Sequence, residues 1–310
     1  MILSVVVPCF NEEEVLPSTI ERLFTVTNEL AAKRKIAPSS EILLIDDGST
    51  DDTWSLIERF TQLHPNKIRG VKLSRNQGHQ IALLAGLFGS RGDWVISVDA
   101  DLQDDISAIE QMVDWAADGY DIVYGVRDSR RSDSFFKRTT AEAYYRLLRM
   151  MGVDVVFNHA DFRLLSRRVI DALKGYREVN LFLRGIIPLM GFGTKCVFYE
   201  RSGRAAGVSK YPLRKMVALA LDGITSFSAF PLRLIMFLGL TIFVISMVLG
   251  TWALIARLYG RVVPGWTSTV VPTYFLGGVQ LFSTGVLGEY LAKIYLEVKA
   301  RPRYHIDKVV

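Results

Sequence analysis

The stretch that decides the fold covers residues 95–105 and reads VISVDADLQDD. Residues 95–98 form a short β-rich run that ends at Asp99. Residues two apart share a face of extended backbone, so Asp99 and Asp101 place two carboxylates on one side of the chain. Carboxylates crowded at a strand end repel each other unless a cation neutralises them, and oxygen ligands suit Mg²⁺ or Mn²⁺. An acidic turn leading into a helix would use the same residue types, and this stretch alone does not decide between the two.

Earlier strand-like runs show the same arrangement of strand, polar loop and helical pattern. The runs are LSVVV at 3–7, EILLI at 41–45 and VKL at 71–73, and a later one occupies 122–126. This repetition predicts a parallel sheet with helical crossovers. The loops at 8–12, 46–48, 75–78 and 99–104 should then converge at one edge, where ligands of open α/β sheets bind. Helix N-termini at that edge favour a phosphorylated ligand.

Helix signals follow these loops. Pro17 fits the first turn of a helix over 17–30, and Ser49 with Asp52 predicts a capping box before the next helix. A third helix is expected over 79–88. No GxGxxG or GxxxxGK[ST] motif follows a strand, which argues against a dinucleotide dehydrogenase and a P-loop ATPase.

Hydropathy divides the chain of 310 residues unevenly. The mean hydropathy is +0.22, and neither 234–256 nor 262–288 contains a charged residue. Each stretch exceeds the roughly 20 helical residues that cross a bilayer, so two transmembrane helices are expected, with long buried core helices as the alternative. Basic residues flank the pair on both sides and are few between them, so both ends should face the cytoplasm.

The remaining composition agrees with a domain in the reducing cytosol. The net charge is +5 with the excess in the C-terminal half, and the two cysteines are too few for a disulfide framework. Residues 2–7 are too short for a signal-peptide core. We expect a catalytic domain over 1–211, a juxtamembrane amphipathic helix over 212–231, a two-helix anchor over 232–294 and a cytoplasmic tail over 295–310. Residues 135–151 are also amphipathic, which fits a helix on an anionic lipid surface or one packed on the sheet.

Seven motifs, in this order, resemble those of the family-two inverting glycosyltransferases, and more narrowly of their polyprenyl-phosphate branch. They are VVVPCFNEEEVL (5–16), DDGSTDDT (46–53), SRNQGHQIALLAG (74–86), DADLQDD (99–105), ADFRLLSRR (160–168), RSGRAAGVSKY (201–211) and FPLR (230–233). The resemblance covers nearly the whole chain. It implies a GT-A fold, which is an α/β, Rossmann-like and mostly parallel sheet with flanking helices.

The resemblance also implies a set of site residues. The nucleotide sugar would be held by Pro8, Phe10, Glu12, Asp46, Asp47, Asp99, Ala100 and Asp101. A divalent metal, Mg²⁺ or Mn²⁺, would be bound by Asp99, Asp101 and Gln103. The acceptor phosphate or donor diphosphate would meet Arg127, Arg138, Arg201 and Lys210, for each of which a solvated surface charge is the alternative. The catalytic pair would be Asp101 and Asp161, with Asp161 at the family's candidate-base position, where an orienting or metal-side role is equally compatible with the chemistry.

The expected reaction moves a hexose, best matched by glucose from UDP-glucose, onto undecaprenyl phosphate with inversion. A phosphate monoester is largely dianionic at pH 7 and scarcely needs deprotonation. GDP-mannose and a UDP-aminoarabinose donor remain open. A polysaccharide synthase would carry a QxxRW motif, which is absent. A flippase-like protein is disfavoured because two spans give little pore-lining surface, and a binding-only protein because every acidic motif position is occupied. We expect the inner membrane as location, a homo-oligomer up to a tetramer, and no nucleic-acid partner.

Overall fold

The computed structural model of the chain describes residues 1–101, 103–127, 159–178, 183–200, 230–259 and 265–310. The chain divides into two compact units. The first contains Met1–Met150, Asp154–Pro212 and Ala300–Val310, and the second contains Met151–Val153 and Leu213–Lys299. The predicted amphipathic segments at 135–151 and 217–229, and the loop at 201–211, lie outside the described residues.

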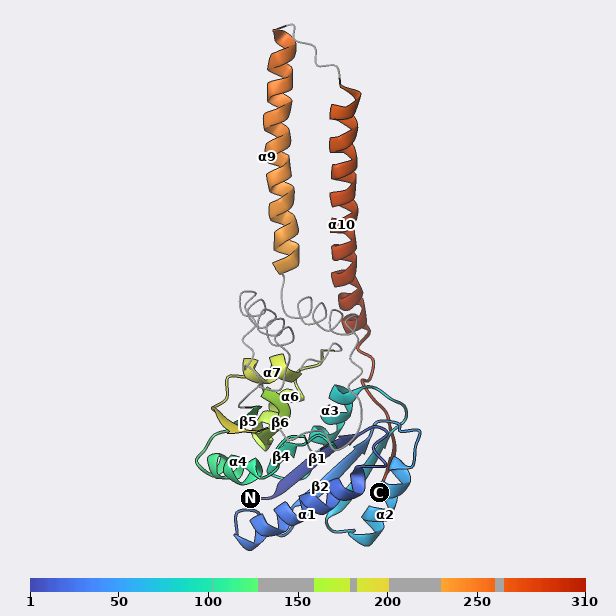
Figure 1. The fold of residues 1–310 in the computed structure, drawn as a ribbon, viewed down its shortest axis with the longest axis vertical. Helices are drawn as coiled ribbons and strands as arrows, with labels where there is room; N and C mark the ends of the chain where they lie inside the picture. The colour runs from blue at the N-terminus through green and yellow to red at the C-terminus, as the bar shows by residue number, and fades with distance from the viewer. Residues whose placement is uncertain (102, 128–158, 179–182, 201–229, 260–264) are drawn as a thin grey trace. The chain divides into compact units, whose positions relative to one another are not determined.

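An eight-stranded mixed sheet organises the first unit (Figure 1). Its strands are β1 (Leu3–Cys9), β2 (Glu41–Asp46), β3 (Ile68–Leu73), β4 (Trp94–Ser97), β5 (Ile122–Arg127), β6 (His159–Ser166), β7 (Thr194–Tyr199) and β8 (Ile306–Val309). The order across the sheet is β7-β5-β6-β4-β1-β2-β3-β8. The predicted parallel arrangement is confirmed for β4, β1, β2 and β3. The sheet is nevertheless mixed, because β6 runs antiparallel to both β4 and β5, and β8 runs antiparallel to β3.

Helices cover both faces of this sheet. They are α1 (Leu16–Ala32), α2 (Thr53–Leu63), α3 (His79–Gly89), α4 (Ala108–Ala117), α6 (Arg167–Leu173) and α7 (Leu183–Leu189). Apolar side chains of α1, α2 and α4 share one core with alternate residues of β1. Helix α3 packs on the other face, where Gly86 allows a close approach, since a Cβ there would lie 2.2 Å from Cγ1 of Val6. Both faces of β1 are therefore buried, as expected for a central parallel strand.

Local predictions near the loops were partly wrong. Pro17 does lie in the first turn of α1, as predicted. Strand β1 does not stop before Pro8 but continues to Cys9, and Pro8 lies past the residues that pair with β4, so its missing N–H leaves no gap in that ladder. Ser49 does not cap α2, whose N-cap is Asp52. The Ser49 hydroxyl instead accepts a hydrogen bond from the backbone amide of Asn11 at 3.0 Å.

The segment expected as a tail completes the sheet. Strand β8 pairs with β3, and Gly70 and Val310 exchange backbone hydrogen bonds of 2.9 Å in both directions. The Ser74 amide donates to the His305 carbonyl at 3.0 Å, directly before the loop that leads to α3. Arg303 donates to the Tyr176 carbonyl at 2.6 Å. The hydrophobic pattern of this short segment did not predict a strand, because its side chains are exposed.

The second unit contains the helices α9 (Phe230–Leu258) and α10 (Trp266–Lys299). They cover most of the two uncharged stretches of sequence. Within the part of the chain that the structure describes, no helix combines the length and the hydropathy needed to cross a membrane. The predicted two-span transmembrane anchor is therefore not supported.

Candidate active site

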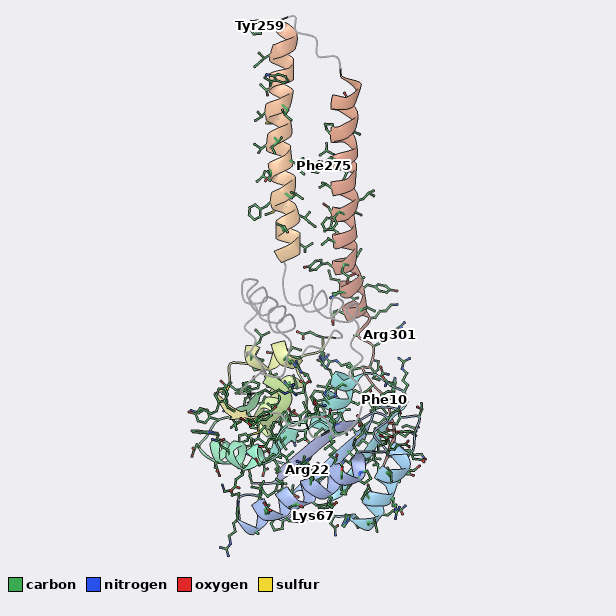
Figure 2. The ribbon with its side chains drawn as sticks, viewed as in Figure 1. Phe10, Arg22, Lys67, Tyr259, Phe275 and Arg301 are labelled. Carbon is green, nitrogen blue, oxygen red and sulfur yellow. The ribbon has the colours of Figure 1, made fainter. Side chains whose placement is uncertain are left out.

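Two loops at the carboxyl edge of the sheet are joined by short polar contacts. The Asn11 side chain accepts a hydrogen bond from the Thr50 amide at 2.9 Å, and the Glu12 amide donates to the Thr53 hydroxyl at 2.9 Å. Asn11 itself has a φ of +54°, which asparagine tolerates better than most residues. These contacts fix the loop after β1 against the loop after β2. Phe10, at the start of the first loop, keeps 43% of its surface exposed (Figure 2).

The two carboxylates that end β2 do different things. Asp46 is fully buried, and its Oδ1 accepts from the Ser49 amide at 3.2 Å. Its Oδ2 is buried without a hydrogen-bond partner among the described residues, and burial raises the pKa of Asp46. The described residues supply no donor for this oxygen. Asp47 instead accepts from the amides of Gln77 at 2.8 Å and Gly78 at 2.9 Å, so it holds the loop before α3.

A hydrogen bond from α1 holds the DADLQDD loop in place. The Thr19 hydroxyl donates to the Ala100 carbonyl at 2.6 Å, and the Ala100 side chain is buried in the core. Ala100 therefore contributes backbone geometry to this loop and not a side-chain contact. The side-chain amide of Gln103 donates through Nε2 to Asp101 Oδ2 at 2.6 Å. Gln103 is buried, whereas Asp101 is only partly so.

Antiparallel pairing brings Asp161 next to Asp99. Ser97 of β4 pairs with Arg163 of β6, so Asp161, two residues before Arg163, lies level with Asp99, two residues after Ser97. The His79 imidazole stands beside both, with Nε2 3.5 Å from Asp99 Oδ1 and 3.6 Å from Asp161 Oδ2. Burial raises the pKa of Asp99 to about 6, an effect that His79 reduces and the neighbouring carboxylates reinforce.

Two arginines hold Asp161. The Arg163 guanidinium, 1% exposed, pairs with Asp161 Oδ1. Arg184 on α7 donates through Nε to Oδ1 at 3.2 Å and through Nη2 to Oδ2 at 3.0 Å. Although burial acts to raise it, these guanidinium groups hold the pKa of Asp161 well below its ordinary range. A carboxylate that is so strongly held as an anion is a poor proton acceptor at neutral pH. Of the two roles left open by the sequence, the geometry favours the orienting one.

A second buried carboxylate, Asp104, engages Arg127. One oxygen, Oδ1, accepts from Arg127 Nε at 3.0 Å, from Arg127 Nη2 at 2.9 Å and from the Tyr199 hydroxyl at 2.6 Å. Its Oδ2 is buried and has no hydrogen-bond partner in the described ranges. The cluster joins the ends of β5 and β7 to the DADLQDD loop. Arg127 reaches the edge of the site through this contact and not as an isolated surface charge.

The DADLQDD loop carries oxygen atoms of the kind that bind divalent cations. Among the described residues, no group of three or more His, Cys, Asp or Glu side chains is arranged to hold a metal ion. Mg²⁺ and its relatives, however, commonly use one or two carboxylates together with substrate phosphates and water. Asp99, Asp101 and the Gln103 carbonyl offer such oxygens on one loop. Burial is the main cause of the raised pKa of Asp99, and the neighbouring carboxylates add to it.

The predicted site residues are thus mostly gathered at one edge. Residues from the ends of β1, β2 and β4 and from β6 lie there as predicted, whereas Arg138, Arg201 and Lys210 lie outside the described residues. Sequence reasoning missed His79, Arg163, Arg184 and Tyr199. Arg163 and His79 lie inside two of the seven motifs, and this position could have marked them as site residues. Arg184 and Tyr199 lie outside all seven motifs.

Comparisons with known proteins agree with this geometry. The family described as glycosyl transferase family 2 matches residues 4–174. The chain is 50% identical over 308 residues to the uncharacterized glycosyltransferase YkoT of Bacillus subtilis (strain 168), covering 99% of this chain and 91% of that protein. It is 43% identical over 312 residues to the bactoprenol glucosyl transferase of Shigella phage SfII, covering 99% and 98%.

Solved structures give a looser match. Glucosyl-3-phosphoglycerate synthase from Mycobacterium tuberculosis, in complex with Mn²⁺, UDP-glucose and phosphoglyceric acid, is 19% identical to this chain. The match covers 72% of this chain and 77% of that chain, with a TM-score of 0.46. That superposition is too loose to carry an inference about ligands.

Proposed function

We propose, from the premise that this chain belongs to glycosyl transferase family 2, that it transfers a glucosyl group from UDP-glucose to the phosphate of bactoprenol (undecaprenyl) phosphate. The observation that carries the proposal is the placement of Asp161, held by two arginines, level with Asp99 of the DADLQDD loop. The acceptor is suggested by relatives such as the phage SfII enzyme, whose name specifies glucosyl transfer to bactoprenol and which matches 99% of this chain.

The donor nucleotide would occupy the edge between the loops after β1 and β2. The exposed Phe10 ring offers an apolar face for the base. The unpartnered Oδ2 of Asp46 would accept a hydrogen bond from the base or ribose, with Pro8 and Glu12 beside it. Asp47 would act indirectly, since its oxygens are bonded to the amides of Gln77 and Gly78.

Asp99, Asp101 and Gln103 would hold a divalent cation against the donor diphosphate. When bound, the cation offsets the negative charge that develops on the leaving group. Nothing in the described structure distinguishes Mg²⁺ from Mn²⁺, and either satisfies an all-oxygen ligand set. Ala100 would shape the loop between the two aspartates.

The acceptor phosphate would attack without a general base. A phosphate monoester has its second pKa near 6 and is largely dianionic at pH 7, so it has no proton to give up. Asp161 would therefore orient Arg163 and Arg184 and not remove a proton. Arg127, Arg138, Arg201 and Lys210 remain our candidates for contacts with the acceptor phosphate and the donor diphosphate, Arg127 being oriented by Asp104. Attack on the face opposite the diphosphate inverts the anomeric centre.

The lipid acceptor implies work at a membrane. We propose that residues 1–211, completed by β8, form the catalytic part and act at the cytoplasmic face of the inner membrane. Large apolar side chains are exposed along both helices of the second unit, among them Phe275, which is 61% exposed (Figure 2). They would suit contact with lipid or with further copies of the chain, up to a tetramer.

The test is transfer of label into the organic phase. Purified protein is incubated with undecaprenyl phosphate, Mg²⁺ or Mn²⁺ and one labelled donor, which is UDP-glucose, GDP-mannose or UDP-aminoarabinose in separate reactions, with EDTA as control. We expect glucose to enter the lipid fraction only when the cation is present. Transfer from another donor alone would refute the choice of sugar. Binding of UDP without transfer from any donor would refute the choice of acceptor.

A further inference from the structure

His79, the first residue of α3, stands between two carboxylates of the proposed active site without a role assigned so far. Its Nε2 lies nearly equidistant from Asp99 Oδ1 and Asp161 Oδ2, at 3.5 and 3.6 Å. We propose that His79 is a positioning residue of the transfer reaction, whose Nε2–H holds the carboxylates of Asp99 and Asp161 in their relative places. This inference rests on the proposed function, because it gives His79 a task in the same reaction.

The electrostatics of the site require a group of this kind. Asp99 and Asp161 lie level on neighbouring antiparallel strands, so their negative charges face each other across the sheet edge. Arg163 and Arg184 are both bonded to Asp161. His79 is the side chain whose single nitrogen approaches both acids. A nitrogen that faces two carboxylate oxygens is a donor, so Nε2 carries hydrogen in this arrangement.

Hydrogen bonds and close backbone contacts from the end of β2 fix the backbone before His79. Asp47 accepts hydrogen bonds from the amides of Gln77 and Gly78, the two residues that precede it. Gly48, with a φ of +69°, lies so close that a Cβ would be 2.7 Å from the backbone of Arg75. Gly78 has a φ of +91° and is the N-cap of α3, a conformation that other residues adopt only at a cost. The end of β2 therefore places His79, which explains why a predicted nucleotide ligand, Asp47, is bonded to a loop instead.

The next residue ties the same helix to α7. Gln80 Oε1 accepts a hydrogen bond from the Leu183 amide at 3.1 Å, and Arg184 follows directly with its two bonds to Asp161. The start of α3 thus contacts both Asp99 of the DADLQDD loop and Asp161, the carboxylate that the two arginines bind. His79 itself is 43% exposed, so its replacement does not open a cavity in the core.

The test compares His79→Ala and His79→Gln with wild type in the undecaprenyl phosphate assay. His64→Gln, a matched substitution on an exposed histidine at the end of α2, serves as control. Loss of the electrostatic contact of Nε2 with two carboxylates, at 3.5 and 3.6 Å, should lower kcat by about 10- to 100-fold for His79→Ala, with the donor KM changed less than about threefold. His79→Gln, whose amide N–H occupies the place of Nε2–H, should recover most of the loss. Melting temperatures of all three variants should stay at the wild-type value.

A double-variant cycle separates positioning from a general loss of structure. If His79 acts through Asp161, then His79→Ala combined with Asp161→Asn should lose little more activity than Asp161→Asn alone. Fully additive losses would overturn the proposal, as would a kcat of His79→Ala within about twofold of wild type. An inactive wild-type protein would instead refute the proposed function. The wild-type reaction of the same assay shows this outcome directly.

Discussion

Replacing Asp161 with asparagine keeps the shape of the side chain and removes one charge from a buried cluster. Arg163 is 1% exposed and Asp161 13% exposed, so solvent screens this pair little. The Nε and Nη1 atoms of Arg163 have no hydrogen-bond partner among the described residues. Its compensation therefore depends on Asp161, and breaking such a pair by removing one partner costs about 3–5 kcal/mol. Arg184 is one-third exposed and adds at most about 1 kcal/mol.

We expect Asp161→Asn to lower the free energy of unfolding by about 3 kcal/mol. This is the lower end of that range, because the variant also relieves repulsion between Asp161 and Asp99. For a unit of this size, that loss corresponds to a melting temperature lower by about 6–12 °C. The assay is thermal or urea unfolding at pH 7. The matched control is Asp171→Asn on α6, whose exposed carboxylate pairs with Lys174 at 2.7 Å and should change stability by less than about 1 kcal/mol.

The pH dependence follows from the sign of the shift. The pKa of Asp161 is lowered in the folded protein, so its stabilisation is complete above the unfolded value of about 3.9 and is lost as the pH falls through the folded pKa. The difference between wild type and Asp161→Asn should thus persist from pH 8 to pH 5 and shrink only in strong acid. It should grow somewhat below about pH 6, where Asp99 becomes neutral and no longer repels Asp161. A variant as stable as wild type at pH 7 would refute the account of Arg163. A difference that already disappears between pH 5 and 7 would refute the lowered pKa.

Three further predictions concern the DADLQDD loop (residues 99–105) and its neighbours. Asp101→Asn should abolish transfer and weaken Mn²⁺ binding in calorimetry, with the circular dichroism spectrum unchanged, because Asp101 belongs to a loop and not to the core; retained activity would remove it as a ligand. Since burial raises the pKa of Asp99 to about 6, protons should compete with Mn²⁺ below that pH, and affinity at pH 5 should be about tenfold weaker than at pH 7; equal affinities would exclude Asp99 from the site. Tyr199→Phe removes one of the donors to Asp104 and should lower stability by about 1.5–3 kcal/mol in urea unfolding, and an unchanged midpoint would show that Arg127 alone satisfies this carboxylate.

The fold was largely predictable because its parallel strands are buried runs that end in polar loops. Residues 3–7, 41–45 and 71–73 identified β1, β2 and β3 to within a few residues, and their shared edge followed from the repeated order of strand, polar loop and helix. Strand β6 was harder to place. Nothing in ADFRLLS indicates that it inserts antiparallel between β4 and β5, and that register alone brings Asp161 level with Asp99.

The roles of individual acids depended on contacts between distant segments. Asp46 and Asp47 are adjacent in sequence and look equivalent, yet one carries an orphaned oxygen and the other is bonded to backbone 30 residues away. Arg184 could not be found from the sequence, since only the hydrogen bonds of α7 bring it to Asp161. Burial and long-range geometry, which no residue pattern encodes, decide such cases.

Strand β8 has a consequence for biosynthesis. The edge of β3 stays unpaired until residues 306–309 have been made, and these come after both α9 and α10 in the chain. A ribosome therefore translates the whole second unit before the sheet of the first can close. During that interval β3 has unpaired backbone groups along one edge, and such an edge can pair with strands of other chains.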